Sequence, residues 1–156
     1  MSIFAVNKTA KFDRSENNSD DSLMNNKNNK ITVLYVEDNA ENIKLMRHIF
    51  EGLFSSVELL IAITGEEGLE VINKIQPDLI LMDIDLPGID GITALRQIKS
   101  NDQLKMPVIA ISAYATQAQI NKGMNAGFDE YITKPLNVSK LKETISRYME
   151  KIRATT

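Results

Sequence analysis

Cysteine and tryptophan are absent from this chain of 156 residues, and histidine occurs once, as His48. Without cysteine, neither a disulfide framework nor a thiolate metal site can form, and a reducing compartment is the natural setting. An excess of charge of one sign is also lacking, because the net charge is −3 and the pI is about 5.2. This balance excludes a general electrostatic affinity for nucleic acid or anionic membranes.

Long hydrophobic runs are missing as well. The longest apolar runs have the length of a strand, far short of the roughly 20 residues that cross a membrane. The chain does not begin with an apolar run followed by a small-residue cleavage site, so we expect no signal peptide, no membrane insertion and a cytoplasmic location. Hydrophobic residues make up 43% and charged residues 25%, which is typical of a globular domain with its own core.

Residues 1–30 contain little that could build a core. Seven of them are asparagine, and the stretch over residues 17–29 is almost wholly polar. A segment of this composition buries too little apolar surface to offset its ordering entropy, so we expect residues 1–30 to be disordered. The folded domain is therefore expected over residues 31–152.

Five short apolar runs divide the rest of the chain, at residues 31–36, 57–62, 79–82, 108–111 and 130–133. Runs that are apolar throughout are typical of strands buried on both faces. Helical segments alternate with them, at residues 39–53, from 64, 90–99, from 116 and 137–152. In the first helix, one face carries Ile43, Met46, Ile49, Phe50 and Leu53. Five alternations of strand and helix predict a doubly wound α/β domain of three layers, with helices on both faces of a five-stranded parallel sheet.

Polar residues stand at the carboxyl ends of the predicted strands. They are Glu37 and Asp38 after the first, Asp83 after the third, Ser112 after the fourth and Lys134 after the fifth. Ligands of open parallel sheets bind beyond this edge. Three convergent carboxylates repel one another unless a cation lies among them, and oxygen ligands without histidine or cysteine favour Mg²⁺.

A carboxylate in such a site can itself be a nucleophile and form an acyl phosphate. Asp83 is the best candidate because it ends the most uniformly apolar strand. Lys134 would supply positive charge for the phosphoryl oxygens, and Ser112 a hydroxyl donor. Each residue alone has an ordinary structural explanation, but their coincidence at successive strand ends favours phosphoryl transfer.

Four motifs carry a family resemblance: VEDN at residues 36–39, LILMDIDLPGIDG at 79–91, AISAYA at 110–115 and YITKP at 131–135. In this order and spacing, the chain resembles the receiver domain of two-component response regulators, from about residue 31 to the last helix. The resemblance implies a flavodoxin-like fold with strand order 2-1-3-4-5. It also implies a phosphorylated signalling switch rather than an enzyme that turns over a substrate.

The resemblance assigns a role to each acidic residue at the strand ends. Asp83 is similar to the phosphoacceptor, and Asp38 and Asp83 are similar to direct Mg²⁺ ligands. Glu37 is similar to an acid that acts on the metal through water. Asp85 stands where the third protein ligand of the family is a backbone carbonyl, so its side chain need not touch the metal.

Further residues match the part of the family that senses the phosphoryl group. Lys134 resembles the lysine that pairs with this group, and the peptide bond to Pro135 is expected to be cis. Ser112 resembles the switch hydroxyl and Tyr131 the aromatic side chain that turns inward with it. Our hypothesis for Tyr114, which flanks the site with Asp85, is that its ring shields the acyl phosphate while the Asp85 carboxylate alters access of the hydrolytic water.

The resemblance places the output surface on the fourth helix, the fifth strand and the fifth helix. Within it, Ile120 and Met124 are expected to belong to the core rather than to an interface. His48, the single histidine, lies off the apolar face of its helix and is expected at the surface, where it is poorly placed to donate a phosphoryl group to Asp83. The expected phosphodonor is therefore another protein, a histidine kinase or a histidine phosphotransfer protein. The downstream partner is expected to be a protein rather than nucleic acid.

Two alternatives to this interpretation remain. Asp83 and Asp85 after an apolar strand also resemble the Asp-x-Asp motif of haloacid-dehalogenase-like phosphatases, but that motif normally follows the first strand and is joined by later acids. A module that only binds partners would be favoured by loss of the acids or of Lys134, and none is missing. The architecture stays open between a stand-alone regulator and the receiver segment of a hybrid kinase.

Overall fold

The structure is a computed structural model, and it describes residues 30–156. The disorder expected over residues 1–30 therefore falls, apart from Lys30, outside the described residues. None of the helices within the described part is long and apolar enough to cross a membrane.

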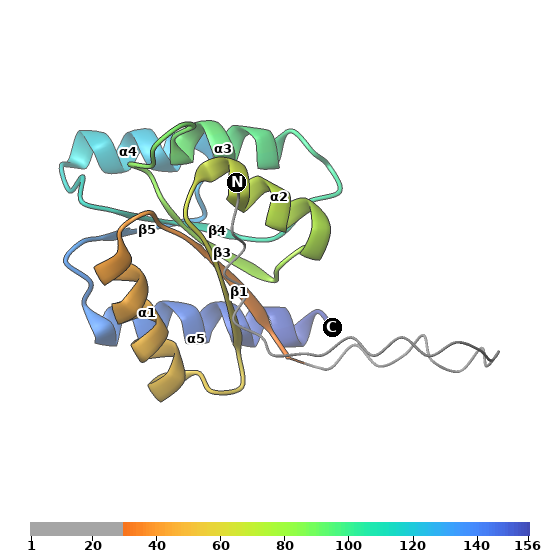
Figure 1. Cartoon of the computed structure of the whole chain (residues 1–156). Coiled ribbons are helices and arrows are strands. Elements are labelled where there is room, and N and C mark those ends of the chain that lie inside the picture. Colours follow the sequence, from red (N-terminus) through yellow and green to blue (C-terminus); the bar gives the residue numbers. More distant parts are fainter. Residues whose placement is uncertain (1–29) are drawn as a thin grey trace.

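Five strands alternate with five helices in the described chain (Figure 1). The strands are β1 (Thr32–Val36), β2 (Glu58–Ala62), β3 (Leu79–Asp83), β4 (Val108–Ser112) and β5 (Glu130–Thr133). The helices are α1 (Ala40–Leu53), α2 (Gly65–Ile75), α3 (Gly91–Lys99), α4 (Gln117–Ala126) and α5 (Val138–Ala154). All neighbouring strands pair in parallel, in the order β2-β1-β3-β4-β5. The predicted fold class and strand order are confirmed.

The sheet is the middle layer of three, with α1 and α5 on one face and α2, α3 and α4 on the other (Figure 1). Successive strand residues point to opposite faces, so β1 sends Val33 and Tyr35 into one hydrophobic cluster and Leu34 and Val36 into the other. Every residue of β3 and β4 is buried. This explains why their sequences are apolar throughout, and why a polar residue that ends either strand calls for a separate explanation.

Each helix is preceded by a capping residue, which lies in the loop after the preceding strand. The caps are Asn39, Thr64, Asp90, Thr116 and Asn137, and each accepts a hydrogen bond from a backbone N–H of the first turn. Such caps satisfy donors that the helix itself leaves unpaired. Since every helix begins near the carboxyl ends of the strands, five loops surround that edge of the sheet.

Two apolar residues are exposed: Leu53, from the apolar face of the first helix, and Met124, which we expected in the core. Leu53 is 41% exposed, because Phe54 after the helix turns inward instead and its ring lies 5.2 Å from that of Phe50. Met124 is also 41% exposed, because Gly123 is the buried residue of α4 and faces the Tyr131 ring. Ile120 is partly buried against the core as expected. The core prediction for Met124 was wrong, because the tendency of apolar side chains to be buried does not decide which face of α4 packs inward. Leu53 shows that helical spacing alone does not place the end of an apolar face.

Candidate functional site

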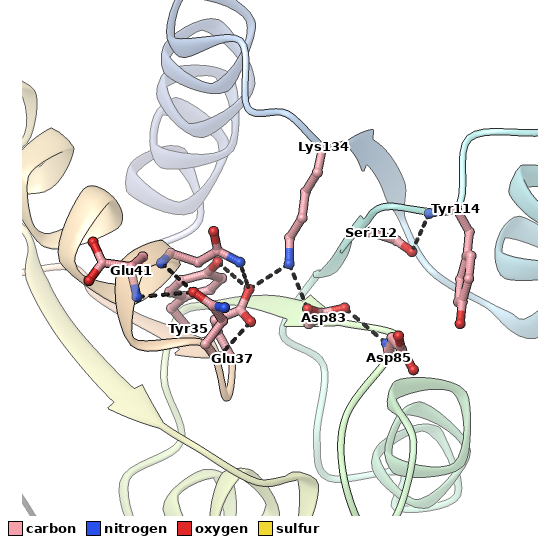
Figure 2. Close-up of polar contacts among 10 residues, drawn as sticks. Tyr35, Glu37, Glu41, Asp83, Asp85, Ser112, Tyr114 and Lys134 are labelled. Carbon is pink, nitrogen blue, oxygen red and sulfur yellow. Dashed lines mark hydrogen bonds and ion pairs between the residues drawn. The ribbon is translucent and has the colours of Figure 1, made fainter.

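The polar residues at the strand ends meet at one edge of the sheet (Figure 2). Glu37 and Asp38 follow β1, while Asp83 and Ser112 are the last residues of β3 and β4. Lys134 follows β5, and its backbone N–H donates to the Ser112 carbonyl at 2.8 Å. Because β1, β3, β4 and β5 are consecutive in the sheet, residues that are up to 97 positions apart in sequence come into contact.

Glu37, Asp38 and Asp83 form a compact acidic cluster. One carboxylate oxygen from each lies within 4.8 Å of the others. Glu37 is 1% and Asp83 4% exposed, while Asp38 is open to solvent. A set of oxygen donors with one side open fits Mg²⁺, which keeps several waters and is usually bound by one or two carboxylates. The Asp85 side chain is outside this cluster and exposed.

The Lys134 side chain lies between two of these carboxylates (Figure 2). Its Nζ is 2.7 Å from Glu37 Oε2 and 2.7 Å from Asp83 Oδ2. Burial lowers the pKa of Lys134, but its hydrogen bonds to Asp83 and Glu37 outweigh burial and raise the pKa above its ordinary value. Lys134 is therefore charged, and its single positive charge is shared between two buried carboxylates.

The two acids differ in how well their charge is compensated. Burial raises the pKa of Asp83 above its ordinary value, and the hydrogen bonds from Lys134 and from the Asp85 backbone N–H do not cancel that effect. Burial also acts on Glu37, but hydrogen bonds from Lys134, the Asn39 backbone N–H and Tyr35 lower its pKa below the ordinary value. Asp83 is thus the carboxylate that an additional cation would stabilise most.

The hydroxyl and aromatic residues form a second group beside the acids. Ser112 Oγ is buried and accepts a hydrogen bond from the Tyr114 backbone N–H at 3.1 Å. The Tyr131 hydroxyl donates to the Tyr114 carbonyl oxygen at 2.7 Å. The Tyr131 ring is 9% exposed and packs closely on Gly123, where an added Cβ would lie 2.8 Å from the ring. The Tyr131 side chain is therefore turned inward in this structure.

Tyr114 and Asp85 lie on the open side of the site. The Tyr114 side chain is 40% exposed, and the Asp85 carboxylate is the main cause that raises the pKa of its hydroxyl. The Asp85 backbone N–H donates to Asp83 Oδ1 at 2.9 Å. The peptide bond between Lys134 and Pro135 is cis, as predicted, and His48 is at the surface, as expected.

Sequence reasoning missed the polar role of Tyr35. We interpreted this residue as part of an apolar strand, yet its buried hydroxyl donates to Glu37 Oε2 at 2.8 Å. A signal was present, because Tyr35 lies two residues before Glu37 and so on the same face of the strand. A buried tyrosine hydroxyl also requires a partner. Asn42 is a further donor, with Nδ2 3.3 Å from Glu37 Oε2.

Comparisons with known proteins agree with this geometry. Residues 33–146 match the family model of the response regulator receiver domain. The polar-differentiation response regulator DivK of Brucella anthropi is 38% identical over 119 residues, which cover 76% of this chain and 95% of DivK. DivK of Brucella ovis is 37% identical over the same shares of both chains.

Solved structures show the same fold. A response regulator from Chloroflexus aurantiacus superposes with a TM-score of 0.72 and 27% identity, over 78% of this chain and 98% of that one. The receiver domain of a sensor histidine kinase from Pseudomonas aeruginosa PAO1, solved with magnesium in its active-site cleft, gives a TM-score of 0.70 at 27% identity, over the same shares. The match to the family model covers most of the chain, so this chain belongs to the response regulator receiver domain family of two-component signalling.

Proposed function

We propose that this receiver domain accepts a phosphoryl group on Asp83, in the presence of Mg²⁺, from a histidine kinase or a histidine phosphotransfer protein. The observation that carries the proposal is the position of Lys134 Nζ, 2.7 Å from the buried Asp83 carboxylate and beside an acidic cluster within 4.8 Å. Asp83 is buried, and unlike Glu37 it has a pKa raised above its ordinary value, because its hydrogen bonds do not cancel the effect of burial. A carboxylate nucleophile beside a lysine and a candidate metal site suits phosphoryl transfer, because positioning and charge stabilisation dominate catalysis of that reaction.

In the proposed step, a bond forms between an Asp83 carboxylate oxygen and phosphorus as the phosphorus–nitrogen bond of the donor histidine breaks. Asp38 and Asp83 would hold the metal directly, Glu37 through water, and Asp85 through its backbone carbonyl. When bound, Mg²⁺ supplies positive charge for the phosphoryl oxygens. Lys134 supplies the second positive charge, because its Nζ already lies at hydrogen-bonding distance from the acceptor. Ser112 would donate its hydroxyl to the product.

The proposed signal to a partner starts from the hydroxyl and aromatic residues beside the acids, Ser112, Tyr114 and Tyr131. The phosphoryl group adds roughly −1.5 to −2 charges and strong acceptor oxygens, which would draw the Ser112 hydroxyl and change the loop that carries Tyr114. That loop is tied to Tyr131 through the 2.7 Å hydrogen bond. The surface that would respond comprises α4, β5 and α5, and it exposes Met124 and Val138. A protein partner of that surface is proposed; the phosphoryl group is held rather than turned over on an outside substrate.

Incubation with acetyl phosphate tests the proposal. With Mg²⁺, intact mass spectrometry is expected to find one added phosphoryl group per chain. With EDTA in place of Mg²⁺, the adduct should be absent, because the three converging carboxylates repel an anionic donor unless a cation is present. An adduct that forms equally well in EDTA would contradict the proposed mechanism.

Substitution of Tyr114 is expected to change how long the phosphoryl group persists. Tyr114→Ala should shorten the lifetime of the acyl phosphate severalfold, because the exposed ring on the open side of the site would no longer restrict hydrolytic water. Tyr114→Phe keeps the ring and should retain the wild-type lifetime. The measurement is the decay of the phosphorylated mass after the donor is removed, and equal lifetimes in Tyr114→Ala and wild type would refute the shielding role.

A further inference from the structure

The Glu37 carboxylate accepts hydrogen bonds from four donors, three of them within residues 35–42 and the fourth Lys134. Its Oε2 accepts from the Tyr35 hydroxyl at 2.8 Å, from Lys134 Nζ at 2.7 Å and from Asn42 Nδ2 at 3.3 Å. Its Oε1 accepts from the Asn39 backbone N–H at 3.1 Å. An ionised carboxylate offers about four lone-pair sites, so the orientation of Glu37 is determined by protein donors.

Tyr35 is the donor whose position depends least on the state of the site. Its ring is fully buried in the cluster between the sheet and α1 and α5, so packing fixes where the hydroxyl lies. Lys134, in contrast, is shared with Asp83 and is the group that a phosphoryl oxygen would attract. Figure 2 shows the Tyr35 ring beside Glu37, on the side away from Ser112 and Tyr114.

We propose that Tyr35 is a positioning residue for the metal site, whose buried hydroxyl keeps Glu37 oriented toward the cation and toward Lys134. This inference rests on the proposed function, because it assigns Glu37 to a Mg²⁺ site. Groups that hydrogen-bond to direct metal ligands set their orientation, and their loss typically weakens metal affinity about 10–100-fold. Because Glu37 would act through water, the expected effect lies at the lower end of that range. Tyr35 touches neither the metal nor the phosphoryl group and acts through Glu37.

Isothermal titration with Mg²⁺ alone tests the inference. Tyr35→Phe keeps the ring and removes one hydroxyl, and it is expected to weaken Mg²⁺ binding about tenfold. Phosphorylation by acetyl phosphate should then require correspondingly more Mg²⁺ but reach the wild-type rate at saturation. A general loosening of the fold would instead lower the rate at every Mg²⁺ concentration.

Tyr148→Phe is the matched control. Tyr148 is a buried tyrosine of α5, 9% exposed, whose hydroxyl lies 3.5 Å from the Asp129 carbonyl oxygen, and Asp129 belongs to neither the acidic cluster nor the donors of Glu37. This variant should bind Mg²⁺ like the wild type. Asn42→Leu removes a weaker donor from the same Glu37 oxygen and should give a smaller loss than Tyr35→Phe, which provides a second test if Tyr35→Phe does not fold.

The outcomes separate the two proposals. If the wild type binds Mg²⁺ and Tyr35→Phe binds it equally well, Tyr35 has no positioning role and the proposed function stands. An equal loss in Tyr35→Phe and Tyr148→Phe would also overturn the role, since it would then be a general effect of losing a buried hydroxyl. If the wild type binds no Mg²⁺, both the proposed function and this inference are wrong.

Discussion

Asp83→Asn is expected to abolish phosphorylation by acetyl phosphate, because an amide has no carboxylate oxygen with which to form an acyl phosphate. The backbone around it should change little, although the new amide nitrogen faces Lys134 Nζ, which would then keep only its bond to Glu37 Oε2. The Asn side-chain oxygen can still accept the Asp85 backbone N–H that now lies 2.9 Å from Asp83 Oδ1. Intact mass spectrometry after incubation with donor and Mg²⁺ is the measurement, and Asp102→Asn, an exposed residue outside the acidic cluster, should be phosphorylated like the wild type.

The same variant is expected to lose the stabilisation that Mg²⁺ confers. A ligand that binds only the folded state adds about 2.7 kcal/mol at a hundred times its Kd, and the wild type should show this as a rise in Tm. In Asp83→Asn the rise should be small, since one of the three clustered carboxylates is gone. A phosphoryl adduct on Asp83→Asn would place the reactive carboxylate elsewhere, and an unchanged Mg²⁺ response would mean that Asp83 is not a metal ligand.

Without Mg²⁺, Asp83→Asn should be at least as stable as the wild type at neutral pH. The pKa of Asp83 is raised mainly by burial, so the folded state binds its proton more tightly than the unfolded state does. Its contribution to stability is therefore present at low pH and is lost as the pH rises through the folded-state pKa. At neutral pH the ionised Asp83 is a cost, which a neutral isostere removes. Urea unfolding in EDTA measures this difference.

Lys134→Met is expected to cost about 3–5 kcal/mol of stability at about pH 8, because it leaves two buried carboxylates without their cation. The Lys134 side chain is 17% exposed, and those of its partners Glu37 and Asp83 are 1% and 6% exposed. In the wild type the raised pKa of Lys134 means that its contribution is present throughout the pH range below about 10.4 and is lost only as the pH rises through the folded-state value.

The loss in Lys134→Met should shrink as the pH falls. Without the lysine, burial and mutual repulsion raise the pKa of both carboxyl groups above the unfolded-state value of about 4. The variant is then most stable in acid and loses stability as the pH rises through the raised values. The wild type behaves oppositely at Glu37, whose lowered pKa makes its contribution disappear as the pH falls.

Urea unfolding of Lys134→Met and wild type at about pH 8 and about pH 5 measures this convergence. Lys74→Met is the control, because Lys74 pairs with Glu70 at 3.8 Å on an exposed helix surface, where such a pair is worth about 0.5 kcal/mol. Mg²⁺ should restore part of the stability lost in Lys134→Met, since it supplies another cation to the same acids. A loss that is equal at both pH values would mean that packing of the lysine stem, rather than its charge, accounts for the effect.

Much of the fold could be predicted because local patterns and the architecture agree. Uniformly apolar strands such as β3 and β4 require cover on both faces, and the alternation with helices leaves a doubly wound parallel sheet as the natural solution. The five helix caps are also local, because a capping side chain acts within its own first turn. Helical spacing failed at Leu53 and the burial tendency of apolar residues failed at Met124, where neighbouring Phe54 and Gly123 decide which residue faces the core.

By itself, the sequence determined which residues stand at the carboxyl ends of the strands, because strand length and apolar pattern are local properties. It thereby brought Glu37, Asp38, Asp83, Ser112 and Lys134 to one edge of the sheet. Only the tertiary structure decided how the charges are shared there: that Lys134 bridges Glu37 and Asp83, and that the buried Tyr35 hydroxyl completes the donors of Glu37. The reason is physical, since hydrogen bonds and pKa values depend on burial and on distances of a few ångströms, which tertiary packing sets for neighbours such as Tyr35 and Glu37 as well as for the distant Lys134.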